Sequence, residues 1–322
     1  MYRVALLALQ NCMYSSLTGP FDFFSVASQE WARMTGQTFS PLFQPTIVAP
    51  EGRTINAFNN IAMFAEASLD NETLYDIVYI PVIFPPLEPH LADTATISWL
   101  TRQAEHGACL CSVCSGAFLL AATGKLNGKR ATTHWMMADS FATLFPKVIL
   151  KKEKILIDEG DAITAGGVSA YNDLSLYLAS RFGSQELAAA LSRMLLIDPF
   201  RRLQSPFATR SFNKSHGDEE ILQVQEWLGK NSANPVSINM LAGQVGLGER
   251  TFMRRFKKAT GDSPMEYLQH LRIHAARQML ESTNKSIEEI TRQSGYEDIS
   301  SFRKLFRRTT GLTPSKYRQR FS

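Results

Sequence analysis

Basic side chains recur in two similar stretches of the sequence, fifty residues apart. Residues 252–269 read FMRRFKKATGDSPMEYLQ, and residues 302–319 read FRKLFRRTTGLTPSKYRQ. Seven of the eighteen aligned positions are identical, and three basic positions of the first copy stay basic in the second. Arginine and lysine donate hydrogen bonds to guanine edges and to phosphate oxygens. A charged face alone also fits an ordinary solvated helix, but its duplication favours a DNA-binding surface.

Paired phenylalanines give the helix in each copy an inward side. Phe252 and Phe256 are four residues apart, as are Phe302 and Phe306, so each pair shares one face of a helix. Lys258 follows the first pair and is expected to contact phosphate. The other polar or basic residues of the outward faces are Arg250, Arg254, Lys257, Ser300, Ser301, Arg303, Lys304 and Arg307.

A shorter amphipathic segment precedes each basic helix and completes a helix-turn-helix pattern. Ser237 and Ser286 are the predicted N-caps of these first helices. Glycine suits the turns, because it enters left-handed backbone conformations freely, and glycine followed by proline is typical of a helix end. The residues with these two roles are Gly246, Gly295, Gly261, Pro264, Gly311 and Pro314.

Cys114 stands where a predicted strand meets a predicted helix. It follows the run Ala-Cys-Leu-Cys-Ser-Val and precedes Ser-Gly-Ala-Phe-Leu-Leu-Ala-Ala. Such a turn lies at the carboxyl edge of a parallel sheet, where ligands bind, and at a helix N-terminus, which favours a thiolate. Gly116 would let the turn close tightly, as in a nucleophile elbow. Cys114 is therefore a candidate ligand-pocket residue, a catalytic or redox thiol, or a residue that only packs.

Three further residues have both a functional and an ordinary interpretation. His134 either lines a pocket beside Cys114 or is a core histidine. Asp22 either holds the cationic end of a zwitterion or caps the helix that starts there. Trp135 either covers a quaternary ammonium group or belongs to the core. The remaining cysteines of the cluster, Cys109 and Cys111, are expected to be small buried residues and not metal ligands, and we expect no cofactor.

Strand-like and helix-like runs alternate in the first two thirds of the chain, which predicts a doubly wound α/β domain with a parallel sheet. The expected strands are residues 4–9, 77–81, 108–113 and 162–165. The expected helices are residues 21–34, 94–106, 115–123, 136–145, 170–181 and 185–196. Residues 39–69 are ambiguous. The predicted domains are 1–198 and an all-α domain 218–322 that Asp218 opens, joined by a linker, 199–217.

Charge is distributed unevenly between the two halves. Residues 1–205 carry 15 basic and 18 acidic side chains, a net charge of −3, and residues 206–322 carry 19 and 12, a net charge of +7. The basic half contains the repeat, as attraction to phosphate requires. No signal peptide and no apolar run of membrane length are visible, and the cysteines do not form a secreted disulfide pattern. These features predict a cytoplasmic protein that has no membrane partner.

The C-terminal region, residues 218–321, resembles the AraC/XylS family of transcription regulators. Gly261-Asp-Ser-Pro264, Gly311-Leu-Thr-Pro314 and Pro314-Ser-Lys-Tyr317-Arg318 carry the resemblance. It implies two helix-turn-helix units joined by a long helix, here residues 264–281. By position, the base- or phosphate-contacting residues are Arg250, Thr251, Arg254, Ser300, Ser301, Arg303 and Lys304. Thr291 departs from the family's small alanine.

Residues 3–196 resemble the DJ-1/PfpI superfamily, which has a flavodoxin-like, class I glutamine amidotransferase-like fold. The matching motifs are Gly19-Pro-Phe-Asp22, Ser112-Val-Cys114-Ser-Gly-Ala, Arg130-Ala-Thr-Thr-His134-Trp135 and Thr164-Ala-Gly-Gly167 with Asp173. The resemblance implies that Cys114 is the elbow cysteine, that His134 is its histidine, and that Asp22 and Ser115 are the acidic and hydroxyl residues of hydratase-like members. With Gly116, these residues form the expected ligand site.

Two departures from the superfamily argue against retained catalysis. Met136 occupies the place of the amidotransferase glutamate, and Ser115 that of the histidine after the cysteine in PfpI-type proteases. Without an orienting carboxylate, His134 is a poor general base, so Cys114 and His134 are expected to be vestigial. Fusions of the two domains form the GlxA-like subfamily, whose first domain is expected to dimerise and to sense a small nitrogenous metabolite.

The sequence thus predicts a regulator, an activator that binds promoter DNA as a homodimer, responds to an effector near Cys114 and contacts RNA polymerase. It is not expected to be an enzyme. Two alternatives stay open. One is a thiol hydrolase or hydratase that carries a DNA-binding tail, and the other is a redox sensor that uses Cys114.

Overall fold

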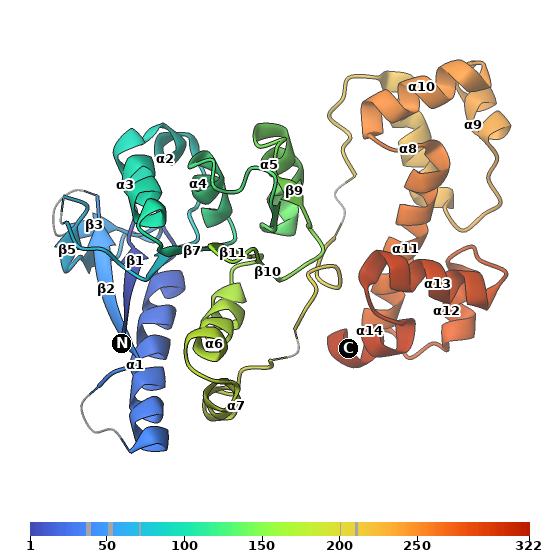
Figure 1. The fold of residues 1–322 in the computed structure, drawn as a ribbon. Coiled ribbons are helices and arrows are strands. Elements are labelled where there is room, and N and C mark those ends of the chain that lie inside the picture. Colours follow the sequence, from blue (N-terminus) through green and yellow to red (C-terminus); the bar gives the residue numbers. More distant parts are fainter. Residues whose placement is uncertain (37–39, 51–53, 71, 200, 210–211) are drawn as a thin grey trace. The chain divides into compact units, whose positions relative to one another are not determined.

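The structure is a computed structural model that describes residues 1–36, 40–50, 54–70, 72–199, 201–209 and 212–322. It divides into two compact units, Met1–Gln204 and Ser205–Ser322 (Figure 1). Unit 1 is an α/β domain, and unit 2 is helical. Among the described residues, no helix has the length and apolar character needed to span a bilayer.

A seven-stranded sheet forms the centre of unit 1, in the order β10-β11-β7-β6-β1-β2-β5. Its strands run parallel except for β10, which pairs antiparallel with β11. The four strands expected from the sequence are confirmed at its core. The strand bounds are β1 Tyr2–Leu7, β2 Phe43–Ala49, β5 Ala67–Ser68, β6 Ile77–Ile80, β7 Cys109–Val113, β10 Leu156–Asp158 and β11 Ala162–Ala165.

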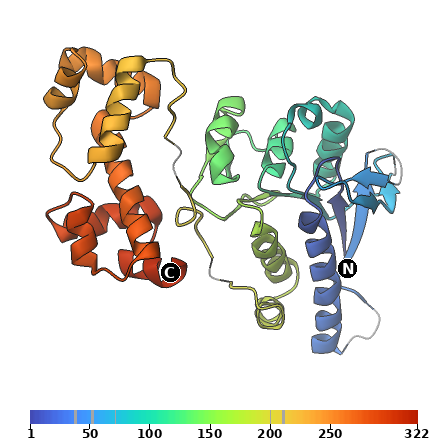
Figure 2. The ribbon, with the colours of Figure 1, turned by 180° about the vertical axis from the view of Figure 1, so that it is seen from behind.

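Helices cover both faces of this sheet, which confirms the doubly wound prediction. In Figures 1 and 2, α1, α6 and α7 lie on one side of the strands, and α2, α3 and α4 lie on the other. The bounds are α1 Ser15–Thr35, α2 Glu88–Ala92, α3 Thr94–Glu105, α4 Gly116–Ala122, α5 Ala138–Leu144, α6 Ala170–Phe182 and α7 Gln185–Met194. A short 3-10 turn, η1 Trp135–Met137, precedes α5.

The first helix begins earlier than predicted. It starts at Ser15 and passes through Pro20, which removes one backbone donor without ending the helix. The Ser16 and Thr18 hydroxyls donate to carbonyls just before the helix. Asp22 therefore lies inside the helix, so the prediction that it caps the helix start is wrong. The ambiguous region 39–69 contains β2, β5 and a two-stranded hairpin, β3 Thr54–Asn56 and β4 Ala62–Phe64. A second small pair is β8 Arg130–Ala131 with β9 Ile149–Leu150.

Unit 2 contains two helix-turn-helix motifs that share one long helix, as predicted. The predicted N-caps Ser237 and Ser286 accept from Met240 N and Glu289 N. Thr291, which departs from the family's alanine, is buried, and its hydroxyl donates to Ile287 O at 2.7 Å. The hydroxyl therefore has a hydrogen-bond partner inside its own helix. The bounds are α8 Glu219–Asn231, α9 Ile238–Gln244, α10 Glu249–Thr260, α11 Pro264–Ser282, α12 Ile287–Gln293, α13 Ile299–Thr310 and α14 Pro314–Phe321.

Part of the segment that the composition predicts as a linker, 199–217, is docked onto unit 1. Lys154 forms an antiparallel bridge with Leu203, and Ile155 N donates to Arg202 O at 3.1 Å. Gln204 is buried, with 3 % of its surface exposed. The boundary between the two units falls directly after Gln204. Prolines and small polar residues predict irregular backbone, but they do not show whether that backbone packs.

Candidate DNA interface and candidate effector site

The exposed faces of α10 and α13 carry the residues that the sequence assigns to DNA. Both helices bury their phenylalanines completely and end at a left-handed glycine, Gly261 or Gly311. All ten assigned side chains are exposed: Arg250, Thr251, Arg254, Lys257, Lys258, Ser300, Ser301, Arg303, Lys304 and Arg307. Arg303 also lies 3.3 Å from Glu288 Oε1 of α12. The structure therefore presents the same kind of polar and basic surface twice, each time on an amphipathic helix.

Helix α11 holds both motifs. Its first half contributes Tyr267 and Leu268 to the core that buries Phe252 and Phe256. Its second half contributes Ile273, Ala276 and Leu280 to the core that buries Phe302 and Phe306. The helix begins with a reciprocal capping box between Ser263 and Glu266. Because α11 packs in both cores, it joins the two recognition helices within unit 2.

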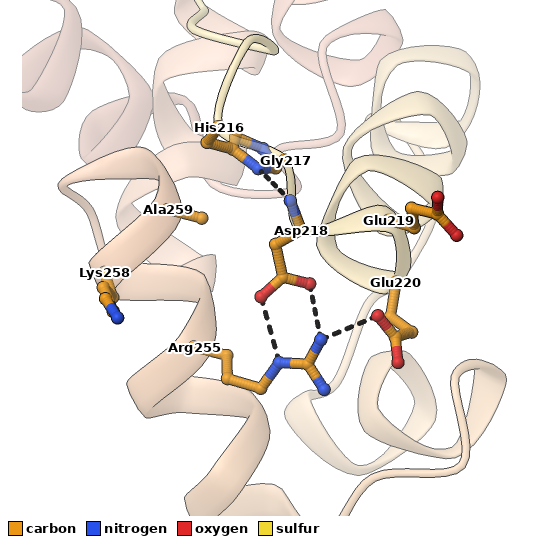
Figure 3. A pocket seen from close by; sticks show the side chains of 8 residues that line it. All are labelled: His216, Gly217, Asp218, Glu219, Glu220, Arg255, Lys258 and Ala259. Atoms are coloured by element: carbon orange, nitrogen blue, oxygen red, sulfur yellow. Dashed lines mark hydrogen bonds and ion pairs between the residues drawn. The ribbon is translucent and has the colours of Figure 1, made fainter.

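Arg255 is a basic residue of α10 whose side chain pairs with acidic residues of unit 2. Its guanidinium donates to both Asp218 carboxylate oxygens, at 2.7 and 3.0 Å, and to Glu220 at 2.7 Å (Figure 3). Asp218 also caps α8 by accepting from Ile221 N. The hydrogen bonds from Arg255 lower the pKa of Asp218 and of Glu220. Arg255, Asp218 and Glu220 line a pocket between α10 and the start of α8, and their contacts hold the recognition helix against α8.

The sequence analysis did not identify this ion-pair cluster, although the repeat contains a signal for it. Arg255 aligns with Leu305 of the second copy, whereas the neighbouring basic positions stay basic in both. Arg255 pairs with Asp218 and Glu220 instead and is not among the positions that stay basic in both copies. The pocket in Figure 3 belongs to that structural cluster, and Cys114 does not line it.

In unit 1, Cys114 occupies the strand-to-helix turn that the sequence predicts. Its backbone is left-handed, with φ of 56°, which is uncommon for a residue other than glycine. Cys114 N donates to Ala165 O at 2.7 Å, and Cys114 O accepts from Thr133 Oγ1 at 2.8 Å. A Cβ on Gly116 would lie 2.5 Å from Pro81 O, so this glycine is required for close approach. The elbow geometry is thus present.

Burial opposes the thiolate that a helix N-terminus favours at this elbow. Cys114 is 4 % exposed, and burial raises its pKa to about 11 despite hydrogen bonds from Ser115 and Gly167 that act in the other direction. The short helix that follows does not outweigh the loss of solvation, because an anion in an apolar site is strongly disfavoured. Burial at this turn therefore favours the neutral thiol of Cys114.

The groups predicted around Cys114 have separate roles. The buried Ser115 hydroxyl donates to Ile83 O and accepts from Ile83 N, at 2.6 and 2.8 Å, so it ties the elbow to a neighbouring loop. His134 is half-buried, and its Nδ1 accepts from Met136 N at 3.1 Å. Asp22 is exposed on α1. Among the described residues, no hydrogen bond joins Cys114 to His134 or to Asp22, so the structure shows no catalytic dyad.

Comparisons with known proteins identify both units. A sequence model of the DJ-1/PfpI family matches residues 4–181, more than half of the chain. The chain belongs to the DJ-1/PfpI family. A helix-turn-helix domain model matches residues 241–320. The two resemblances seen in the sequence are therefore confirmed, and this family member carries a helix-turn-helix domain after its DJ-1/PfpI unit.

Relatives that align with two thirds or more of this chain are named HTH-type transcriptional regulators. The HTH-type transcriptional regulator CdhR of Pseudomonas aeruginosa is 26% identical over 91% of this chain and 87% of its own length. The regulator ArgR of the same species is 34% identical over 68% of this chain and 67% of its own. An isonitrile hydratase of Pseudomonas putida is 25% identical over 61% of this chain and 79% of its own.

Solved structures share the fold of unit 1. The crystal structure of an AraC family transcriptional regulator from Pseudomonas putida matches with a TM-score of 0.51 and 21% identity. It covers 61% of this chain and 100% of the solved one. At this identity the likeness establishes the fold alone, and the site must be argued from the residues of this chain.

Proposed function

We propose that the protein is a sequence-specific DNA-binding transcription regulator that responds to a small metabolite bound near Cys114. The repeated exposed basic faces of α10 and α13 carry this proposal, because one long helix holds both and each is backed by its own core. The net charge of +7 on residues 206–322 supports it. The names of relatives that align with most of the chain also support it.

The two recognition helices are proposed to enter neighbouring major grooves, about one helical turn apart. We further propose that the protein acts in the cytoplasm as a homodimer and as an activator that contacts RNA polymerase. A dimer would place two such modules on paired half-sites, and effector binding would then change which half-site spacings the modules can span. Linkage requires that DNA shift effector affinity by the same factor.

The DNA face is tested by one base-reading and one phosphate-contacting substitution. Arg254→Ala is expected to weaken the binding free energy for duplexes with the preferred bases by about 1–3 kcal/mol. Arg254→Lys is expected to restore only part of that binding free energy. Lys258→Ala is expected to weaken binding to all sequences and to lower the salt slope by about 1. Fluorescence anisotropy on specific and random duplexes at several salt concentrations measures both effects.

Lys230→Ala is the matched control, because Lys230 is an exposed lysine at the end of α8 and belongs to neither recognition helix. It should leave both affinity and salt slope near the wild-type values. If Arg254→Ala and Lys258→Ala behave like this control, the DNA face has been placed on the wrong side of unit 2.

The effector site is proposed at the elbow, with Asp22, Cys114, Ser115, Gly116 and His134 as its residues. The left-handed backbone of Cys114 supports this placement, because strained conformations gather at functional sites. Among the described residues, the Asp22 carboxylate and His134 Nε2 have no hydrogen-bond partner. The Asp22 carboxylate would receive the cationic end of a nitrogenous ligand. Because His134 Nδ1 accepts from Met136 N, the neutral ring carries its proton on Nε2, which would donate to an acceptor on the ligand.

A thermal-shift panel of amino acids, betaines and polyamines tests the effector site. A ligand of the elbow should raise the melting temperature of wild type and of Cys12→Ala, and it should leave Cys114→Ala unchanged. Cys12 is the matched control, since it is also a buried free cysteine of unit 1. A ligand that stabilises Cys114→Ala as much as wild type binds elsewhere.

The isonitrile hydratase relative favours a second candidate function, a thiol hydratase. The raised pKa of Cys114 and its lack of a hydrogen bond to His134 speak against it. We infer that unit 1 is not an enzyme. Isonitrile turnover that Cys114→Ser abolishes would establish the hydratase instead.

A further inference from the structure

We propose that unit 1 contains a binding site for a primary carboxamide, that Gln204 of the same chain occupies it, and that this latch transmits the effector signal. The proposal rests on the proposed function for its regulatory part, while the site itself stands on contacts within unit 1. Those contacts surround the Gln204 side chain, which is the last one of unit 1.

The site matches the two ends of a carboxamide. Gln204 Nε2 donates to Lys154 O at 2.8 Å and to Thr133 O at 2.9 Å, the two shortest contacts for its two hydrogens. Thr132 Oγ1 at 3.1 Å and Lys152 O at 3.4 Å are the other acceptors near this nitrogen. On the other side, Trp135 N donates to Gln204 Oε1 at 3.2 Å. Acceptors thus face the nitrogen, and a donor faces the oxygen.

This arrangement of donors and acceptors disfavours groups that are similar to a carboxamide in size, such as a carboxylate or an ammonium group. A carboxylate has no hydrogen to donate and would place a buried charge against two carbonyl oxygens. An ammonium group satisfies the carbonyls but leaves Trp135 N without an acceptor. Gly166 makes room for the group, because a Cβ there would lie 2.0 Å from Gln204 Nε2. The site is therefore built around a primary carboxamide.

The site is connected to the elbow through one residue. The Thr133 carbonyl accepts from Gln204, and the Thr133 hydroxyl donates to Cys114 O at 2.8 Å. Trp135, the donor to Gln204, follows directly after His134. An effector that moves the elbow or His134 would therefore disturb both ends of the carboxamide site.

The neighbouring residues hold the same segment. Arg201 Nε donates to Asp173 Oδ1 at 3.2 Å, and Arg201 Nη1 donates to Ser169 Oγ at 2.9 Å. Gln204 N donates to Glu153 O at 2.8 Å. The next residue, Ser205, belongs to unit 2, where its carbonyl accepts from Arg277 of α11 at 3.0 Å. Release of Gln204 would therefore detach the chain before Ser205 from unit 1 and leave the contact of Ser205 with α11 in place.

Chemical rescue tests the site without effector or DNA. Gln204→Ala removes a fragment equivalent to acetamide. We expect the amide hydrogens of Trp135, Ile155 and residue 204 to exchange about tenfold faster or more in the full-length variant. Acetamide should restore the slow exchange at Trp135, whereas acetate, which has a similar shape but no N–H, should not. Gln204→Glu should behave as Gln204→Ala does without acetamide.

Arg202→Gln is the matched control, because Arg202 is exposed and the bond that it makes to Ile155 N uses its backbone carbonyl, which the substitution keeps. Its exchange rates should equal those of wild type. Unchanged exchange in Gln204→Ala, or equal rescue by acetate, would overturn the carboxamide site.

The regulatory part is tested on duplexes that wild type selects from a random pool. Insertion of about 5 base pairs between half-sites turns them to opposite faces of the DNA. We expect at least a tenfold loss of affinity for wild type and less than a threefold loss for Gln204→Ala, with equal binding to single half-sites. An equal loss in both proteins would overturn the latch as a regulator. Failure of the proposed function would differ, since Arg254→Ala would then leave binding unchanged.

Discussion

Phe306→Ala is expected to lower the free energy of unfolding of unit 2 by about 3–5 kcal/mol. Phe306 is completely buried, and its ring packs 5.7 Å from that of Phe302 and 5.4 Å from that of Tyr317, centroid to centroid. Removal of the Phe306 ring leaves a cavity at the contact between α13 and α14. The two helices can move only slightly to close it, because the core around them is tightly packed. Such a loss is a large fraction of the stability of a small domain.

Urea unfolding followed by circular dichroism and by tryptophan fluorescence measures this effect. Trp227 reports on unit 2, whereas Trp31, Trp99 and Trp135 lie in unit 1. The unit 1 transition should not move, and DNA affinity should fall together with folded unit 2. Met253→Ala is the control, because Met253 is 41% exposed on α10 and its truncation should cost no more than about 0.5 kcal/mol. Equal midpoints for the two variants would contradict the assigned core.

The DNA-binding half could be predicted almost completely from the sequence. Its signals are local, since the Phe252–Phe256 spacing, the serine caps and the glycine stops each act within one or two helical turns. Duplication let each copy support the other. What was missed there, the Arg255 cluster with Asp218 and Glu220, depends on residues about 35 positions away along the chain.

Unit 1 was predictable at its centre and not at its edges. The buried strands β6, β7 and β11 read as continuous apolar runs between turn signals. Strands such as β3 and β4 have three residues each, too few to show a period, and β2 contains Pro45, which argues against a strand.

Gln204 and the state of Cys114 both depend on tertiary packing. A single glutamine in a proline-containing stretch carries no signal for a buried role, and Gly166 is the residue of this site whose type fits close approach by another group. The position of Cys114 at the elbow was predicted correctly, and the sequence left its ionisation open. A helix dipole is visible in the sequence, whereas the burial that outweighs it is not.

The second large effect concerns this thiol. At pH 7.5, Cys114 in the native protein is expected to react with iodoacetamide about 100-fold more slowly than in the urea-unfolded chain. Its pKa of about 11, against an ordinary 9.0, lowers the thiolate fraction by two powers of ten, and 4% exposure slows access further. Quenched alkylation followed by peptide mass spectrometry measures this cysteine separately from the other three.

The alkylation rate of Cys114 should also depend on pH differently in the native and in the unfolded protein. The native rate should rise about tenfold per pH unit up to about pH 11, whereas the unfolded rate should level off near pH 9. Because the folded state retains this proton longer than the unfolded state does, the contribution of Cys114 to stability is present below pH 9 and declines between pH 9 and 11. A redox sensor requires the opposite behaviour, a thiolate near neutral pH. If Cys114 of the native protein were alkylated at pH 7.5 as fast as in urea, the interpretation of Cys114 as a neutral thiol of the ligand site would be wrong. Cys114 would then be a peroxide-reactive thiol. Promoter binding would then be expected to follow peroxide and not metabolites.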